Sequence, residues 1–174
     1  MGYNPQVHHR QSIRLRGYDY SQPGMYFVTI CTRERMEAFG EIQDGEMHLS
    51  SSGEIAHSIW STMPKRFPNI ELDLFVIMPN HMHGILVITA QSQGAMNCAP
   101  TSGMRNLTLG QMIRAYKAAV TRTIRYAGMP EFAWHRNYYE HIARLRKMNE
   151  LDRIRQYILD NPARWAEDSL YGRN

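Results

Sequence analysis

The stretch FVIMPNHMHGILVI, residues 75–88, carries the strongest structural signal in the chain. Apolar residues dominate on either side of Pro79-Asn80, a pair that favours a tight turn. Strands that are apolar on both faces are typical of the centre of a covered sheet. The stretch therefore predicts a β-hairpin of two central strands, over 70–78 and 81–89. The first strand would carry on one face Ile70, Leu72, Leu74 and Val76.

Outside this hairpin the sequence predicts two more strands and three helices. The order strand, helix, two strands, helix, strand, helix predicts an α+β sandwich, in which helices cover an antiparallel sheet. The strands cover 26–32, which is β-branched and aromatic, and 132–143. The first helix is capped by Ser51 or Ser52. The last begins at about Glu150, is capped by Asn149 and is ended by Pro162. The middle helix has an apolar stripe of Leu109, Met112, Ile113, Tyr116, Val120, Thr123 and Ile124.

Length and composition indicate a single globular domain. The chain has 174 residues, of which 43% are apolar and 21% charged, so disordered, collagen-like and coiled-coil chains are excluded. We expect one domain over 1–174, with a basic N-terminal arm (1–24), a flexible loop rich in Gly, Ser and Asn (91–106) and a C-terminal tail (168–174).

We infer the cellular compartment from three features that the sequence lacks: cysteine motifs, a signal region and a membrane-spanning segment. Two cysteines far apart form neither a disulfide framework nor a metal knuckle. The N-terminal residues have no apolar signal region, and the longest apolar run, 84–90, is too short to span a bilayer. We therefore expect a soluble, cytoplasmic protein that does not bind membranes.

His81 and His83 stand two residues apart at the head of the second hairpin strand. Because residues i and i+2 of a strand point to one face, both imidazoles converge while Met82 faces the opposite core. Imidazole is a common ligand of divalent metals. A pair at this spacing also arises by chance, but two buried neighbouring histidines without a metal are costly to satisfy. The pair predicts an incomplete metal site that needs a third ligand.

Tyr157 and Asn161 lie one helical turn apart on the last predicted helix, at the edge of its apolar stripe. A phenol and an amide at that edge can reach a cleft. Equally, Tyr157 fits an amphipathic boundary and Asn161 fits a helix C-cap before Pro162. The residues alone leave both readings open, and the candidates for the third ligand are Asn161, Asp160, Glu140 and His141.

With its two histidines, the stretch 75–88 resembles the histidine–hydrophobic–histidine (HUH) signature of the single-tyrosine transposases. That family includes small insertion-sequence transposases and the bacterial REP-associated tyrosine transposases. The resemblance covers about residues 10–167 and is closest to the REP-associated branch. Further matches, in the family's order, are RQSIRLRGYDYSQPGMYFVTICT (10–32), LGQMIRAYKAAVTRTI (109–124) and WHRNYYEHIARLRKMNELDRIRQYILDNPARW (134–165).

This resemblance implies roles for four residues. His81 and His83 match the family's metal-binding histidines, Tyr157 matches its nucleophile, and Asn161 stands where the family places a third metal ligand. The implied fold is a ferredoxin-like sandwich with the histidine strand central. Ligand types alone would admit zinc, manganese or iron, whereas the resemblance implies Mg²⁺ or Mn²⁺.

The implied activity is a DNA transposase that cleaves and rejoins single-stranded DNA. A tyrosine phenolate that attacks a DNA phosphate forms a 5′-phosphotyrosine and releases a 3′-hydroxyl, which conserves the energy of the bond for rejoining. A free phenol has a pKa of about 10, so the nucleophile needs help. We hypothesise that Arg153, four residues before Tyr157, stabilises the negative charge. Tyr138 and Tyr139 are rival nucleophiles by residue type, but the resemblance does not support them.

The expected partner is single-stranded DNA that folds into hairpins of palindromic repeats. A net charge of +4 permits nucleic acid without demonstrating it. Basic residues on the arm and on the solvent side of the long helix suit salt-dependent phosphate contacts: Arg10, Arg14, Arg16, Arg114, Lys117, Arg122 and Arg125.

Other interpretations stay open at this point. A relaxase or replication initiator would use the same chemistry, although the short chain argues against it. A catalytically silent hairpin-binding protein is the third possibility. The family includes dimers that exchange the tyrosine helix and monomers with a complete site, so a homodimer is one option for this chain.

Overall fold

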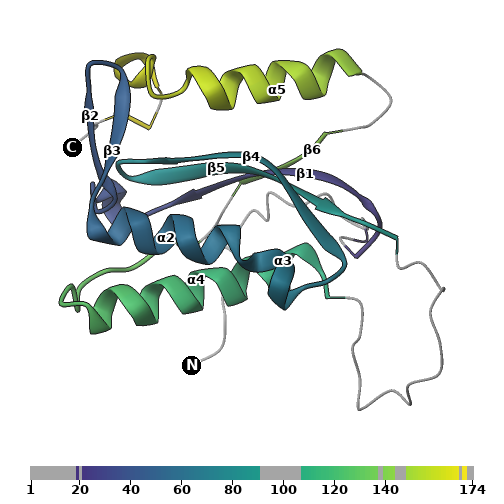
Figure 1. The fold of residues 1–174 in the computed structure, drawn as a ribbon, viewed down its shortest axis with the longest axis horizontal. Coiled ribbons are helices and arrows are strands. Elements are labelled where there is room, and N and C mark those ends of the chain that lie inside the picture. Colours follow the sequence, from purple (N-terminus) through teal and green to yellow (C-terminus); the bar gives the residue numbers. More distant parts are fainter. Residues whose placement is uncertain are drawn as a thin grey trace, which may run out of the picture.

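The described residues fold in the computed structural model into a main sheet with helices on both faces and a smaller two-stranded sheet (Figure 1). The structure describes Asp19, residues 21–90, 107–136, 139–143, 148–168 and 170–171. The N-terminal arm up to residue 18 and the predicted loop 91–106 lie outside these residues. None of the described helices is long and apolar enough to cross a membrane.

Four strands form the main sheet in the order β4-β5-β1-β6, and every neighbouring pair is antiparallel. The strands are β1 (Gly24–Cys31), β4 (Ile70–Met78), β5 (His81–Ile88) and β6 (Tyr139–Ala143). Since β5 lies between β4 and β1, the prediction of a central histidine strand is confirmed. The α+β ferredoxin-like class is confirmed with it.

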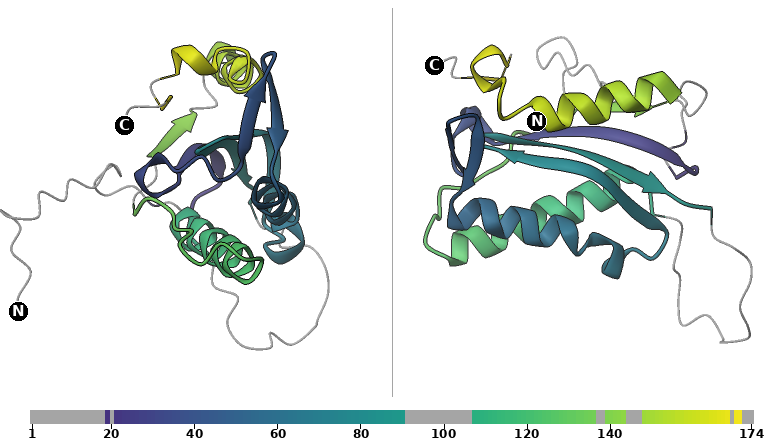
Figure 2. Two further views of the ribbon diagram at one scale, coloured as in Figure 1. Left: turned by 90° about the vertical axis from the view of Figure 1, so that its left-hand side faces the viewer. Right: turned by 45° about the horizontal axis from the view of Figure 1, so that its top comes forward.

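The two faces of the sheet have different helical covers (Figures 1 and 2). One face packs against α2 (Ser51–Ser61), α3 (Met63–Arg66) and α4 (Leu109–Tyr126), and this is the larger core, with Trp60 and Tyr116 fully buried. The other face packs against α5 (Met148–Asp160), through Ile158 of the helix and Met25 and Ile85 of the sheet. The stripe predicted for the last helix is thus the one that faces the sheet, and its members are Leu151, Ile154 and Ile158.

A break in register corrects the prediction for β4. The pairing with β5 shifts between Leu72 and Phe75, so the alternation of faces changes within the strand. Leu72 therefore contacts the core under α2 and α4, whereas Leu74 and Val76 contact α5. The prediction that Ile70, Leu72, Leu74 and Val76 share one face is wrong because of this bulge. The same strand lies at one edge of the described sheet rather than at its centre.

The helix ends also differ from the sequence-based expectation. Ser50 caps α2, because its hydroxyl accepts the Gly53 amide and donates to the Ala38 carbonyl. Neither Ser51 nor Ser52 is the cap. The last helix begins at Met148, so Asn149 lies inside it.

Two further expectations from the sequence are corrected. A capping box of Thr108 and Gln111 starts α4 at Leu109, where the predicted apolar stripe also begins, but Thr123 of that stripe is exposed. Among the described residues of the strand expected over 132–143, the structure has β6 and an isolated bridge from Trp134 to Thr32.

A second hairpin stands beside the main sheet and was not predicted. It consists of β2 (Gly40–Gln43) and β3 (Glu46–Leu49), with Asp44 and Gly45 at its tip in left-handed conformations, φ 51° and 80°. A Cβ added to Gly45 would lie 3.5 Å from Ala163 Cα. The tip therefore supports the turn after α5, where the chain continues into a short 3-10 helix, η2 (Trp165–Glu167). Another such turn, η1 (Arg33–Arg35), follows β1.

Candidate functional site

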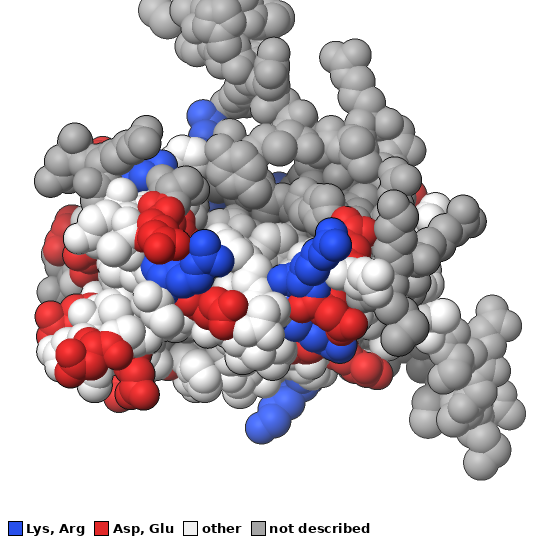
Figure 3. Space-filling view, turned by 90° about the horizontal axis from the view of Figure 1, so that it is seen from above, with Lys and Arg blue, Asp and Glu red and all other residues white. Residues whose placement is uncertain are grey.

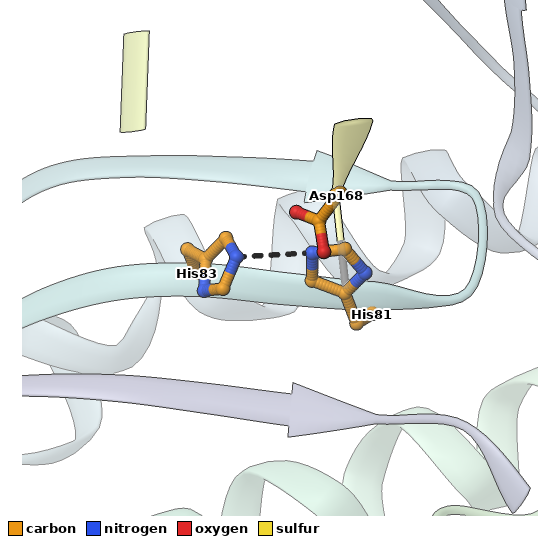
Figure 4. A group of neighbouring side chains, drawn as sticks. All are labelled: His81, His83 and Asp168. Atoms are coloured by element: carbon orange, nitrogen blue, oxygen red, sulfur yellow. Dashed lines mark hydrogen bonds between the residues drawn. The ribbon is translucent and has the colours of Figure 1, made fainter. Parts of the chain in front are cut away.

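His81 and His83 lie on the α5 face of β5, with their side chains 0% and 2% exposed. Met82 between them is buried in the core on the opposite face, so the predicted convergence of the two rings is confirmed. The two Nε2 atoms are 3.0 Å apart (Figure 4). Phe27 of β1 stacks on His83 with ring centroids 5.4 Å apart, and Trp165 packs against His81. Aromatic rings thus fix both imidazoles in place.

Hydrogen bonds behind the rings set the tautomer of His81. The Asn80 amide nitrogen donates to the Leu170 carbonyl at 3.0 Å, so its Oδ1 is the atom that faces His81 Nδ1 at 2.8 Å. Because Oδ1 can only accept, Nδ1 of His81 carries the proton and Nε2 presents a lone pair. A metal-binding histidine needs such an acceptor behind its ring, because the acceptor orients the ring and leaves the other nitrogen free for the ion.

Thr29 is the hydrogen-bond partner of His83 Nδ1. Its hydroxyl lies 2.8 Å from His83 Nδ1, and the two residues are opposite each other in the β1–β5 pairing. A hydroxyl can donate or accept, so Thr29 satisfies either tautomer of the ring. With the proton on Nδ1, His83 also directs an Nε2 lone pair at the space shared with His81.

Burial keeps both rings neutral. The pKa of His83 is lowered from 6.5 to about 4, mainly because burial disfavours the charged imidazolium. The pKa of His81 is also well below its usual value, through burial and through the neighbouring His83. Neutral imidazoles are the form that coordinates a cation.

Tyr157 reaches this pair from α5. Its hydroxyl lies 3.1 Å from His83 Nε2, and its ring packs edge-on against Phe27. The side chain is 44% exposed, so the phenol contacts both the histidine and solvent. Burial raises the pKa of Tyr157, and the charge of Asp168 raises it further, so the phenol is protonated at neutral pH.

The helix that carries Tyr157 is tied to the sheet by an ion pair. Arg155 Nη2 lies 2.6 Å from Asp73 Oδ2 at the bulge of β4. Asp73 also accepts the Leu74 amide, so the bulge presents a fixed carboxylate to α5. Arg153, the predicted partner of the nucleophile, is exposed on the same helix, and the contacts among described residues do not link it to Tyr157.

Asp168 lies close to both histidines. The sequence patterns did not predict it as a site residue. One ligand atom from each of His81, His83 and Asp168 lies within 4.8 Å of the other two (Figure 4). Asp168 belongs to the segment predicted as a C-terminal tail, and its Oδ1 accepts the Leu170 amide at 2.6 Å. No periodic pattern marks it, because it follows η2 outside any regular element.

Asn161, the predicted third ligand, is 4% exposed and donates from Nδ2 to Asp168 Oδ2 at 3.1 Å. Since the carboxylate can only accept, the orientation of the amide is fixed and its Oδ1 points elsewhere. That oxygen is buried and has no hydrogen-bond partner within the described part of the chain. An unsatisfied buried carbonyl oxygen is costly, and a bound cation would satisfy it.

The donor set therefore fits a divalent cation. His81, His83 and Asp168 supply two imidazole nitrogens and a carboxylate, and Asn161 adjoins this cluster through its hydrogen bond to Asp168. Asp160, the second of the four candidates for a third ligand, lines the opening beside Tyr157. The remaining two, Glu140 and His141, are on β6, where the structure describes the backbone alone.

The predicted DNA-binding residues fall into three groups. Those of the arm, Arg10, Arg14 and Arg16, lie outside the described residues, as do the rival nucleophile Tyr138 and the side chain of Tyr139. Arg153 is on α5. The structure brings the remaining four together along one groove on α4: Arg114, Lys117, Arg122 and Arg125.

Comparisons with known proteins identify one relative by sequence and one by fold. No family model matches the chain. An uncharacterised protein of Haemophilus influenzae is 40% identical over 177 residues, which cover 97% of this chain and 97% of that protein. A solved structure, the REP-associated tyrosine transposase bound to a REP hairpin, aligns with a TM-score of 0.60 at 18% identity, over 87% of this chain and 73% of that chain. The chain therefore belongs to one family with the Haemophilus influenzae protein, and it has the fold of the REP-associated tyrosine transposases that its motifs resemble.

Proposed function

We propose that this protein is a metal-dependent tyrosine transposase that cleaves and rejoins single-stranded DNA at hairpin-forming repeats. The observation that carries the proposal is the position of the Tyr157 hydroxyl, 3.1 Å from His83 Nε2 beside a metal-type cluster. A phenol that is partly exposed and touches such a cluster is placed to attack a phosphate from solvent. The fold shared with a transposase bound to a REP hairpin supports the same substrate class.

In the proposed reaction the Tyr157 oxygen bonds to phosphorus and the bond from phosphorus to the 3′-oxygen breaks. The phenol loses a proton and the released 3′-oxygen gains one, so a 5′-phosphotyrosine and a 3′-hydroxyl form without any other reactant. The reverse attack rejoins strands. Phe27 and the sheet hold the phenol ring, and the Arg155–Asp73 pair holds the helix that carries it.

His81, His83, Asp168 and Asn161 would hold Mg²⁺ or Mn²⁺. When bound, the ion supplies a Lewis acid and a template for a phosphate oxygen. The carboxylate and amide oxygens suit a hard cation, which also binds phosphate oxygens. The two imidazole nitrogens are compatible with Mn²⁺. The negative charge of Asp168 also raises the pKa of Tyr157. A cation bound to Asp168 would offset that charge and so favour the phenolate.

The proposal is tested with labelled hairpin oligonucleotides from the DNA that flanks the gene, incubated with Mg²⁺ or Mn²⁺ and run on a denaturing gel. We expect a covalent adduct that disappears in Tyr157→Phe, in His83→Gln and with EDTA. Tyr171→Phe is the matched control, because it removes the hydroxyl of another exposed tyrosine, three residues after Asp168. Tight hairpin binding with no adduct would support the silent binding protein instead, and an adduct that survives in Tyr157→Phe would refute the assigned nucleophile.

A further inference from the structure

Asn80 is buried in the tight turn between β4 and β5, directly before His81, and is 1% exposed. Asparagine is common in turns because it tolerates a positive φ or bonds to the backbone of its own turn. Asn80 does neither, since its φ is not positive and its amide bonds to the His81 ring and to the Leu170 carbonyl. The role of this side chain therefore lies outside the turn.

The backbone of the turn is held from two sides. The Thr32 amide and hydroxyl both donate to the Asn80 carbonyl, at 2.9 Å and 2.8 Å. The Phe39 amide donates to the Pro79 carbonyl at 3.0 Å. Since Thr32 and Phe39 are themselves buried, the side chain of Asn80 projects from a fixed backbone.

The two ends of the Asn80 amide contact two different parts of the site. Its Oδ1 accepts the proton of His81 Nδ1 at 2.8 Å, which leaves Nε2 of that ring as the ligand atom. Its Nδ2 donates to the Leu170 carbonyl at 3.0 Å. Leu170 in turn donates its amide to Asp168 Oδ1 at 2.6 Å. One side chain is thus connected to a histidine directly and to the carboxylate through one residue.

Asp168 depends on such contacts, because it follows η2 and lies outside any regular element. Trp165 packs on His81 with ring centroids 5.7 Å apart. This ring contact keeps the segment near the histidines, but it does not set the direction of a carboxylate. Hydrogen bonds do so, since Oδ1 accepts from Leu170 and Oδ2 accepts from Asn161. Leu170 is the donor that is bonded to the turn.

The charge of the surrounding surface does not explain cation binding. Acidic and basic side chains lie next to each other on the face that carries α5 (Figure 3). A surface needs one sign of charge to raise the local concentration of an ion strongly. The affinity for a cation therefore depends on how the cluster is arranged, with one ligand atom from each of His81, His83 and Asp168 within 4.8 Å of the others.

We propose that Asn80 is the positioning residue of the cation site: Oδ1 orients His81, and Nδ2 holds Leu170 so that Asp168 faces both histidines. The inference rests on the proposed function in one respect, namely that the cluster binds a cation. Asn80 itself contacts neither the cation nor DNA in this assignment. Its loss should therefore change the affinity for a cation through His81 and Asp168 alone.

Two substitutions separate the two ends of the amide. N80D keeps an oxygen for His81 but has no hydrogen for the Leu170 carbonyl at neutral pH, whereas N80A removes both bonds. The added charge of N80D would by itself attract a cation, so a loss of affinity reports position and not charge. N69D makes the same substitution in the turn before β4 and is the matched control.

Hydrogen–deuterium exchange in EDTA measures the C-terminal segment, and calorimetric titration with Mn²⁺ measures the site. In N80D we expect faster exchange over 165–171, unchanged exchange in β5 and α5, and a Mn²⁺ affinity lower by about 10- to 100-fold. N80A should lose at least as much affinity, and N69D should match the wild type in both measurements. Because N80D acts through Asp168, it should cost little further affinity in the double variant N80D/D168N.

The outcomes separate this inference from the proposed function. Wild-type exchange and Mn²⁺ affinity in N80D, the same losses in N69D, or a full further loss in N80D/D168N would each overturn the role of Asn80. A wild-type adduct on the denaturing gel together with an unchanged N80D would refute the role of Asn80 alone. The expected losses in N80D without any wild-type adduct would refute the transposase alone, and no Mn²⁺ binding by the wild type would refute both.

Discussion

Acidification in EDTA should destabilise the protein through His83. This ring has a pKa of about 4 in the folded chain against 6.5 when free. Above pH 6.5 it is neutral in both states and contributes nothing to the pH dependence. Between pH 6.5 and 4 the unfolded chain binds a proton that the folded chain does not, so stability falls as the pH falls. A difference of 2.5 pKa units corresponds to about 3 kcal/mol.

This loss is large, because domains of this size are stable by about 5–15 kcal/mol. His81 adds to it in the same direction, since its pKa is also lowered by burial. Added Mn²⁺ should oppose the loss and move it to lower pH, because the cation needs the neutral rings.

Urea unfolding at a series of pH values between 7 and 4 measures the effect. In His83→Gln the part of the slope due to this ring should disappear, whatever the overall stability of the variant. His57→Gln is the matched control, because His57 is an exposed histidine on α2. If wild type and His83→Gln lose the same stability between pH 7 and 4, the buried neutral histidine is not the cause and the reasoning fails.

Three substitutions test the contacts around the site. Asp168→Asn should weaken Mn²⁺ binding by about 10- to 100-fold in calorimetry, and unchanged affinity would remove Asp168 from the cluster. Thr29→Val keeps the volume but not the hydroxyl opposite His83 Nδ1, so a similar loss of metal affinity is expected, with a near-native circular dichroism spectrum. Gly84→Ala would place a Cβ 2.8 Å from the Trp60 ring and should cost about 1–3 kcal/mol in urea unfolding, and a neutral effect would contradict the close packing described here.

Regular patterns in the sequence predict the direction of the two site histidines. The alternation around His81 and His83 predicted which face each ring occupies, and the structure confirms it. The spacing of Tyr157 and Asn161 predicted that both lie on the last helix, but only Tyr157 does, because α5 ends at Asp160. Where one periodic element carries the side chain, as for the two histidines, local reasoning is enough.

Features that depend on irregular backbone escaped prediction. The bulge after Leu72 reverses the faces of β4, and alternation alone cannot show an inserted residue. Asp168 reaches the histidines from a segment without periodicity, through a fold of the chain that only tertiary contacts determine. The hairpin of β2 and β3 did carry a signal, since Asp44-Gly45 is a standard two-residue turn.

Peptide mapping of the covalent adduct tests the transposase proposal most directly. The adduct formed with a flanking-DNA hairpin and Mn²⁺ would be digested with nuclease and protease and analysed by mass spectrometry. We expect a nucleotide joined through its 5′-phosphate to the peptide that carries Tyr157. A nucleotide on Tyr138 or Tyr139, or no adduct with a hairpin that the protein binds tightly, would contradict it.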